Sequence, residues 1–200
     1  MALTNGEIDW ILHDNVNAYL YDLEGQKAIL ANEFEVTTVS VPRVELLNAV
    51  IDNSREFDPY DRFFTPLMRT YYDLLYAPQD HVIVPDDGDD ARDILGAKSV
   101  LPLKRDAILV PLMEEVARHD SAFVYDRKGK ALLLLESGAI SSLPLGQEHA
   151  FAFSLLKEGG YDMHDLMEDM TDVDVDGDEA ERLLSSIDPV PFTREAMARE

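Results

Sequence analysis

Apolar positions along the chain follow two spacings, one typical of strands and one typical of helices. Residues 16–31 and 121–136 each contain two short apolar runs, separated by an Asp-x-x-Gly turn at 22–25 and 126–129. Two strands joined by such a turn predict a β-hairpin. Residues 34–41 alternate apolar and polar side chains and are rich in Val and Thr, which predicts a third strand.

Helical spacing dominates two longer segments. Residues 42–77 carry apolar side chains three and four positions apart and contain a cluster of aromatic residues between Phe57 and Tyr76. This pattern predicts aromatic helices. Residues 147–187 show the same spacing, with Gly159-Gly160 as a stop signal, and predict further helices. Shorter apolar runs at 81–85 and 107–110 are interpreted as strands, the first of a buried type.

These elements predict an α+β protein in which helices are mixed with antiparallel β-hairpins and the C-terminal third is helical. The chain length allows one domain or two small ones. We divide it into an N-terminal α+β unit over residues 1–104 and a C-terminal α+β unit over residues 105–200. Whether the two units pack as one domain stays open.

The two hairpins also resemble each other in sequence. Ala122 to Gly129 matches Ala18 to Gly25 at a constant offset of 104 residues, and His-Asp precedes both segments. The match reflects either a duplicated helix-plus-hairpin unit or two hairpins that converged on the same turn. The sequences that follow the hairpins do not match, which favours convergence.

The composition shows that the protein carries a large negative charge. The 200 residues include 40 Asp or Glu and 17 Lys or Arg, a formal charge of −23, yet 46% of them are hydrophobic. The surplus of carboxylates is shared almost equally between the two halves, so it describes a folded surface rather than an acidic tail. Because carboxylates keep a surface hydrated when concentrated salt screens their repulsion, the composition favours a protein from a halophile.

The same charge excludes several classes of partner. No basic patch could release counterions from a polyanion, so we expect no sequence-independent binding to nucleic acid or to an anionic membrane. The longest apolar runs are too short to span a bilayer, and the N-terminus lacks the features of a secretory signal. We therefore expect a cytoplasmic or virion protein. The absence of Cys excludes disulfides and thiolate chemistry.

One acidic loop resembles the calcium loop of an EF-hand. Residues 172–183 place Asp172, Asp174 and Asp176 at loop positions 1, 3 and 5 and Gly at position 6, with Asp178 next, and helices are predicted on both sides. Position 12, however, is Leu183 instead of the bidentate Glu. We predict either a degenerate Ca²⁺ or Mg²⁺ site at these aspartates, or a solvated loop that caps the following helix. No other cofactor is expected.

Catalytic motifs are missing. The sequence contains no phosphate-binding glycine loop, no nucleophile elbow and no paired metal-binding histidines. Three of the five histidines precede an Asp, and His13 and His119 lie at predicted helix ends, where the helix dipole favours a cation. We therefore expect a protein that is not an enzyme.

The aromatic helices suggest how such a protein could act. Met68, Tyr72 and Tyr76 lie beside the main apolar stripe and widen it, which suits burial between subunits, where Tyr is enriched. We predict a non-enzymatic structural or interaction protein of a halophile, a homo- or hetero-oligomeric subunit of an assembly such as a haloarchaeal virus particle. The alternative is a small regulatory domain that senses a divalent cation or a nucleotide.

Overall fold

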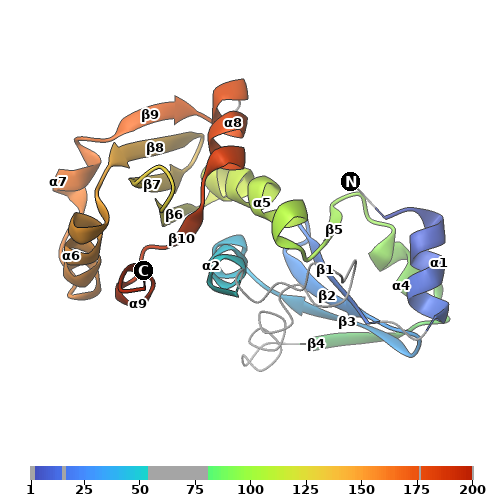
Figure 1. Cartoon of the computed structure of the whole chain (residues 1–200). Helices are drawn as coiled ribbons and strands as arrows, with labels where there is room; N and C mark the ends of the chain where they lie inside the picture. Colours follow the sequence, from blue (N-terminus) through green and yellow to red (C-terminus); the bar gives the residue numbers. More distant parts are fainter. Residues whose placement is uncertain (1–2, 15–16, 54–80, 176, 200) are drawn as a thin grey trace. The chain divides into compact units, whose positions relative to one another are not determined.

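The structure is a computed structural model that describes residues 3–14, 17–53, 81–175 and 177–199. Within these residues it contains eight helices and two antiparallel sheets of five strands each, which confirms the mixed α+β class. The chain divides into two compact units, Met1–Leu109 and Val110–Glu200. The boundary between them falls inside a helix, and each unit is described by itself (Figure 1).

Unit 1 contains one sheet with the strand order β4-β3-β2-β1-β5, in which every neighbouring pair is antiparallel. Its elements are α1 (Asn5–His13), β1 (Ala18–Asp22), β2 (Lys27–Ala31), β3 (Glu35–Ser40), α2 (Arg43–Asn53), β4 (His81–Pro85), α4 (Asp89–Leu95) and β5 (Val100–Pro102). The predicted hairpin over 16–31 is β1–β2, and the predicted strand over 34–41 is β3.

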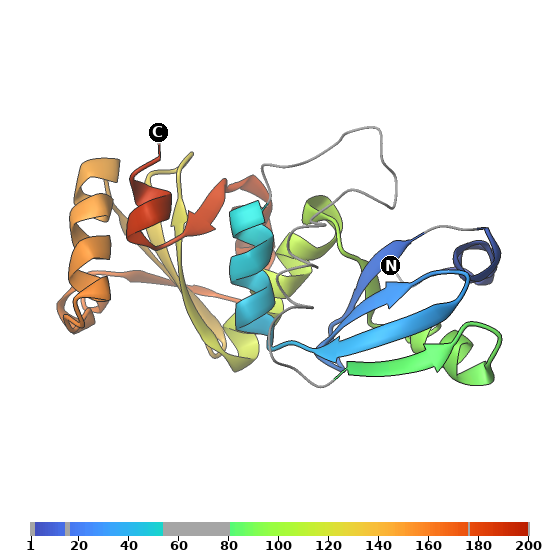
Figure 2. The ribbon, with the colours of Figure 1, turned by 90° about the horizontal axis from the view of Figure 1, so that it is seen from below.

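Unit 2 contains the second sheet, with the order β10-β6-β7-β8-β9. Its elements are α5 (Arg105–His119), β6 (Ser121–Asp126), β7 (Ala131–Glu136), β8 (Ala139–Pro144), α6 (Gln147–Glu158), α7 (His164–Met167), β9 (Thr171–Asp174), α8 (Asp178–Ser186), β10 (Pro189–Pro191) and α9 (Arg194–Met197). The predicted hairpin over 121–136 is β6–β7. The sheet lies between α5 and α8 on one side and α6 and α9 on the other (Figures 1 and 2).

The two units have the same topology. In chain order, β1 to β5 occupy the same places in their sheet as β6 to β10 occupy in theirs. The registers agree as well, because the pair Val36↔Val84 in unit 1 corresponds to Ile140↔Val173 in unit 2. Both units also carry a helix before the first strand, a helix after the third and a helix between the last two.

Backbone details at equivalent positions extend this agreement through the first half of each unit. The residue after the turn glycine has a positive φ in both hairpins, 49° at Gln26 and 51° at Lys130. A Cβ on the turn glycine would collide with the turn Asp in either unit, so both turns require Gly. The structural agreement between the two units therefore continues beyond the hairpins, although the sequences that follow them do not match at the offset of 104 residues.

A second sequence match, at an offset of 89 residues, covers the last part of each unit. The segment 87–95 (Asp-Gly-Asp-Asp-Ala-Arg-Asp-Ile-Leu) corresponds to 176–184 (Asp-Gly-Asp-Glu-Ala-Glu-Arg-Leu-Leu). Pro102 and Arg105 likewise correspond to Pro191 and Arg194. The offset changes between α2 and β4 because residues 54–80 form a connection 15 residues longer than residues 159–170 of unit 2.

Each unit buries the same face of its sheet under the helices that flank it. In unit 1, Leu20, Ile29 and Val36 form one core with residues of α1 and α4. Their equivalents in unit 2 are also buried: Val124, Leu133, Ile140, Ala180 and Leu184. In the part of the chain that the structure describes, no helix is both long and apolar enough to cross a bilayer.

Three predicted elements are wrong in detail. Residues 107–110, expected as a strand, belong to α5, since buried Ile108, Leu112 and Val116 recur at helical spacing along one face. The predicted helical stretch 147–187 is interrupted by strand β9, which completes the sheet beside β8. The strand at 81–85 exists as β4, but it is an exposed edge strand rather than a buried one.

A buried tyrosine near the end of the first strand bonds, in each unit, to the segment between the third strand and the helix that follows it. The hydroxyl of Tyr21 donates to the Val41 carbonyl, and that of Tyr125 donates to the Leu145 carbonyl, both at 2.8 Å. Tyr21→Phe and Tyr125→Phe should each lower the free energy of unfolding by about 1 kcal/mol, because a buried carbonyl loses its donor. Urea unfolding of both variants measures this; a change in only one of them would contradict the equivalence of the two units.

Candidate functional site

The acidic loop is a strand, a turn and the start of a helix. Asp172 lies in β9 opposite Ser141, whose hydroxyl donates to its carboxylate at 2.5 Å. Asp174 ends β9, Asp178 begins α8, and Asp176 lies outside the described residues. The helix expected before the loop exists as α7, but it ends at Met167, and β9 forms the first positions of the loop. An EF-hand loop follows a helix, so this backbone is not that of an EF-hand.

The repeated sequence explains the Asp-Gly-Asp part of this loop. Gly88 of unit 1 and Gly177 of unit 2 both precede a helix with the same extended backbone, φ −90° and ψ 153° against φ −93° and ψ 154°. Carboxylates in the first turn of each helix interact favourably with its dipole. Among the described residues, no cluster of three or more His, Asp or Glu side chains could hold a metal ion. The cation and nucleotide alternatives remain untested predictions.

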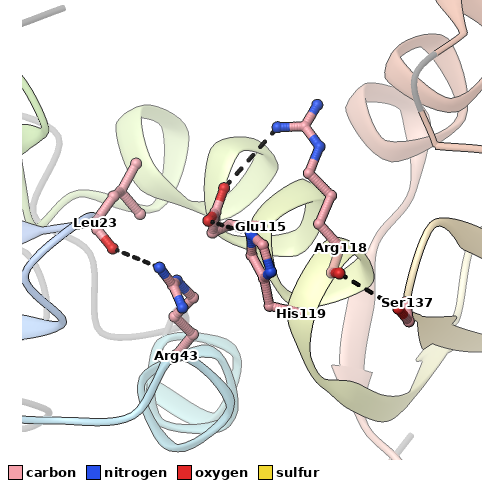
Figure 3. A network of polar contacts seen from close by, with 6 residues as sticks. All are labelled: Leu23, Arg43, Glu115, Arg118, His119 and Ser137. Atoms are coloured by element: carbon pink, nitrogen blue, oxygen red, sulfur yellow. Dashed lines mark hydrogen bonds and ion pairs between the residues drawn. The ribbon is translucent and has the colours of Figure 1, made fainter.

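Two histidines, His119 and His164, each lie near a glutamate one helical turn away. On α5, the His119 Nε2 lies 3.2 Å from a Glu115 carboxylate oxygen, and Arg118 approaches the same carboxylate (Figure 3). The Ser137 hydroxyl donates to the Arg118 carbonyl, which joins the end of α5 to the turn after β7. In unit 1, Arg43 donates to the Leu23 carbonyl at 3.1 Å. These contacts hold helix ends and turns in place.

One lysine of unit 2 lies against aromatic rings. The Lys157 ammonium on α6 is 5.5 Å from the ring centre of Phe123 on β6 and 5.9 Å from that of Phe192. Partial burial lowers the pKa of Lys157, and the neighbouring Glu158 carboxylate opposes this shift. Cation–π contacts of this kind attach α6 to the sheet. The sequence analysis did not identify this cluster, because its members come from three distant segments.

An apolar surface continues along the outer side of α6. Leu155, Leu156 and Tyr161 are 39%, 42% and 63% exposed, although all three are large and apolar. A groove of about 500 Å³ lies between the first turns of α6 and the end of α9, lined by Gln147, Glu148, Phe151, Met197 and Ala198. The position equivalent to Leu155 on α2 of unit 1 is Ile51, which is only 3% exposed.

Unit 1 has its own apolar surface at the edge of its sheet. Val82 and Ile83 on β4 are 56% and 58% exposed, and Phe34, in the turn that leads into β3, is 72% exposed. In the described part of unit 1, these are the large apolar side chains found exposed. β4 lies at the outer edge of the sheet beside β3 (Figure 2). We call Phe34, Val82 and Ile83 the β4 edge.

The predicted interface residues Met68, Tyr72 and Tyr76 lie outside the described residues. The two surfaces that the structure does describe were not predicted as sites. A run of three β-branched residues between His81 and Pro85 was visible in the sequence, and it is typical of a strand buried on both faces. The sequence contains no signal that β4 lies at a sheet edge.

Comparison with known proteins gives no match: no family model fits the chain, and neither curated proteins nor solved structures match it.

Proposed function

We propose that the chain is a non-enzymatic structural or interaction protein of a halophile. It acts as a subunit of a larger protein assembly, of the kind found in a haloarchaeal virus particle. The apolar surfaces on both units carry this proposal, because they present large aliphatic and aromatic side chains on a chain whose formal charge is −23. Contiguous apolar surface on an otherwise charged protein is typical of a protein–protein interface.

The α6 surface supports the proposal in a second way. Because the two units share one fold, the exposure of side chains at equivalent helix positions can be compared directly. Ile51 and Leu47 on α2 are 3% and 0% exposed, whereas the equivalent Leu155 is 39% exposed. An apolar helix face that one repeat buries and the other exposes is suited to burial by another protein.

The large negative charge indicates that the subunits assemble in concentrated salt. Two acidic subunits repel each other in dilute buffer, and at about 1 M salt the screening length falls to about 3 Å. Contacts between apolar surfaces then form without a long-range penalty. Salt of the sulfate or phosphate type also strengthens the burial of apolar surface.

The mass of the purified chain in solution tests the proposal. In about 3 M KCl, light scattering coupled to size-exclusion chromatography should give a mass that is a multiple of 22.5 kDa and that rises with protein concentration. The same sample in about 0.1 M KCl is the control and should have a lower mass, because repulsion between the acidic surfaces is then poorly screened. A mass of 22.5 kDa at every concentration in high salt would contradict the proposal.

A further inference from the structure

Sheet edges differ in how well they are protected against pairing with another strand. β5 and β10 are only three residues long, and both end in Pro, at Pro102 and Pro191. β9 carries the exposed carboxylate of Asp172. Short strands, prolines and charged side chains are the usual ways to block an edge. β4, with the sequence His-Val-Ile-Val-Pro, also ends in Pro, but it is five residues long and lacks any acidic or basic side chain apart from His81.

The hydrogen-bonding pattern shows which groups β4 presents outward. The N–H of Asp86 donates to the Phe34 carbonyl, so residues 34 and 86 form a hydrogen-bonded pair. The register is continuous from there, and hydrogen-bonded pairs alternate along an antiparallel ladder, so Val84 and Val82 also bond to β3. The N–H and C=O groups of Ile83 and His81 therefore point away from β3. None of the residues that the structure describes pairs with this side of β4.

We propose that β4 is a self-association edge, at which two copies of this chain pair through antiparallel β4 strands around a two-fold axis at Ile83. This inference rests on the proposed function, and it names both the surface and the partner. The pairing joins the sheets of unit 1 from the two copies into one continuous sheet. It gives the exposed backbone groups of β4 the hydrogen bonds that an edge strand lacks.

The β4 sequence fits this two-fold pairing because its apolar core is palindromic. Ile83 lies opposite Ile83 of the partner subunit, and Val82 lies opposite Val84 of the partner subunit. Each Ile83 donates its N–H to the other and accepts in return. The His81 N–H donates to the carbonyl of Pro85 of the partner subunit. Pro85 accepts this bond through its carbonyl but has no N–H to donate in return, so each of these two outer pairs makes one hydrogen bond instead of two.

Side chains around the axis favour a second copy over an unrelated strand. Every apolar pair across the axis joins two β-branched side chains, a combination that stabilises antiparallel pairs. His81 falls beside the carboxylates of Asp86 and Asp87 that follow β4 of the partner subunit, since the two strands run in opposite directions. The exposed side chain of Phe34 belongs to the C-terminal end of β4, because the Asp86 N–H bonds to the Phe34 carbonyl.

Ile83→Pro tests the pairing while leaving the bonds between β4 and β3 intact, because the Ile83 N–H points away from β3. It removes two of the intermolecular hydrogen bonds, so the dissociation constant for self-association in about 3 M KCl should rise at least about tenfold. Asp172→Pro is the matched control, since Asp172 occupies the position on β9 equivalent to Ile83 on β4. Sedimentation equilibrium should show no change in its self-association.

Ile83→Cys is a second test that keeps every backbone bond. The chain contains no Cys, so any disulfide must form between two copies. Opposite residues of a hydrogen-bonded antiparallel pair lie about 5.5 Å apart at Cα, within the range of a disulfide. Under mild oxidation, Ile83→Cys should form a covalent dimer in most molecules, whereas Asp172→Cys should stay a monomer on a non-reducing gel.

The outcomes separate this inference from the proposed function. If the wild type assembles, but Ile83→Pro leaves its mass unchanged and Ile83→Cys cross-links no better than Asp172→Cys, the β4 pairing is wrong and the proposed function stands. If the wild type is a monomer at every concentration, the β4 pairing and the proposed self-assembly are both wrong. A strand from another protein then becomes the candidate partner. Should Ile83→Pro lose its circular dichroism signal, the cross-linking result decides.

Discussion

Dilute buffer is expected to unfold most of this protein at temperatures at which it stays folded in concentrated KCl. The 40 carboxylates repel one another across a surface with only 17 Lys and Arg. At about 0.1 M salt the screening length is about 10 Å, so the repulsion between neighbouring carboxylates is only weakly screened. In about 3 M salt this repulsion is almost fully screened. The free energy of unfolding should rise on the order of 3 kcal/mol, and the midpoint temperature about 10 °C or more.

Thermal melts followed by circular dichroism over a series of KCl concentrations measure this effect. A variant with Glu24, Glu45 and Glu136 replaced by Gln is the control, because all three side chains are exposed and keep their size when the charge is removed. Its midpoint should depend less steeply on salt and should be higher than that of the wild type in dilute buffer. Equal stability of the wild type in dilute and concentrated KCl would overturn the halophile interpretation.

Asp126→Ala should be the most damaging single substitution in unit 2, with a loss of about 3–5 kcal/mol in the free energy of unfolding. The Asp126 side chain is 6% exposed and accepts three backbone hydrogen bonds. The N–H groups of Lys128, Gly129 and Asp188 donate to it at 3.0, 2.9 and 2.9 Å. Alanine would leave these donors without an acceptor, and it would release the β6–β7 turn from the segment that leads into β10.

Asp22→Ala is the matched control for this variant. Asp22 occupies the same turn of unit 1, is less buried, and accepts the Ser99 hydroxyl at 2.6 Å. Its loss should cost about 1–2 kcal/mol. Both substitutions remove one negative charge from a chain at −23, so a general charge effect would stabilise both. Urea unfolding measures the difference, and a loss below about 0.5 kcal/mol for Asp126→Ala would contradict the role assigned to its carboxylate.

The hairpins show what a local pattern can predict. An Asp-x-x-Gly turn and the apolar runs on either side of it were sufficient to place β1–β2 and β6–β7. The reason is short-range: the turn Asp bonds to nearby groups, and the turn glycine has no room for a Cβ. Both requirements are satisfied within a few residues, so they leave a visible mark in the sequence.

The second half of each unit shows where local patterns fail. A short apolar run such as residues 107–110 has no period of its own and therefore predicts a strand, and only the burial of Ile108, Leu112 and Val116 along one face shows that it belongs to α5. Residues 172–174 were predicted to start a loop, either a degenerate cation site or a solvated loop, because alternating aspartates fit a loop as well as an edge strand. Their pairing with β8, more than 25 residues earlier in the chain, makes them a strand.

For the candidate sites too, the sequence shows the residues but not the structural elements that hold them. The acidic residues and their spacing were visible in the sequence, but the strand that holds Asp172 was not. The apolar residues of β4 were visible too, and their chemistry suggested burial. That they lie at an unprotected edge follows from the strand order, which depends on long-range pairing.

The sequence by itself determined the α+β class, the two hairpins and the excess of surface carboxylates, because composition, turn chemistry and side-chain alternation act over a few residues. Only the tertiary structure decided that the two units share one strand order and register, that β9 is a strand and that β4 and α6 carry exposed apolar side chains. These properties depend on which segments pair across long stretches of chain. Backbone hydrogen bonds make those pairings, and they leave little trace in side-chain identity.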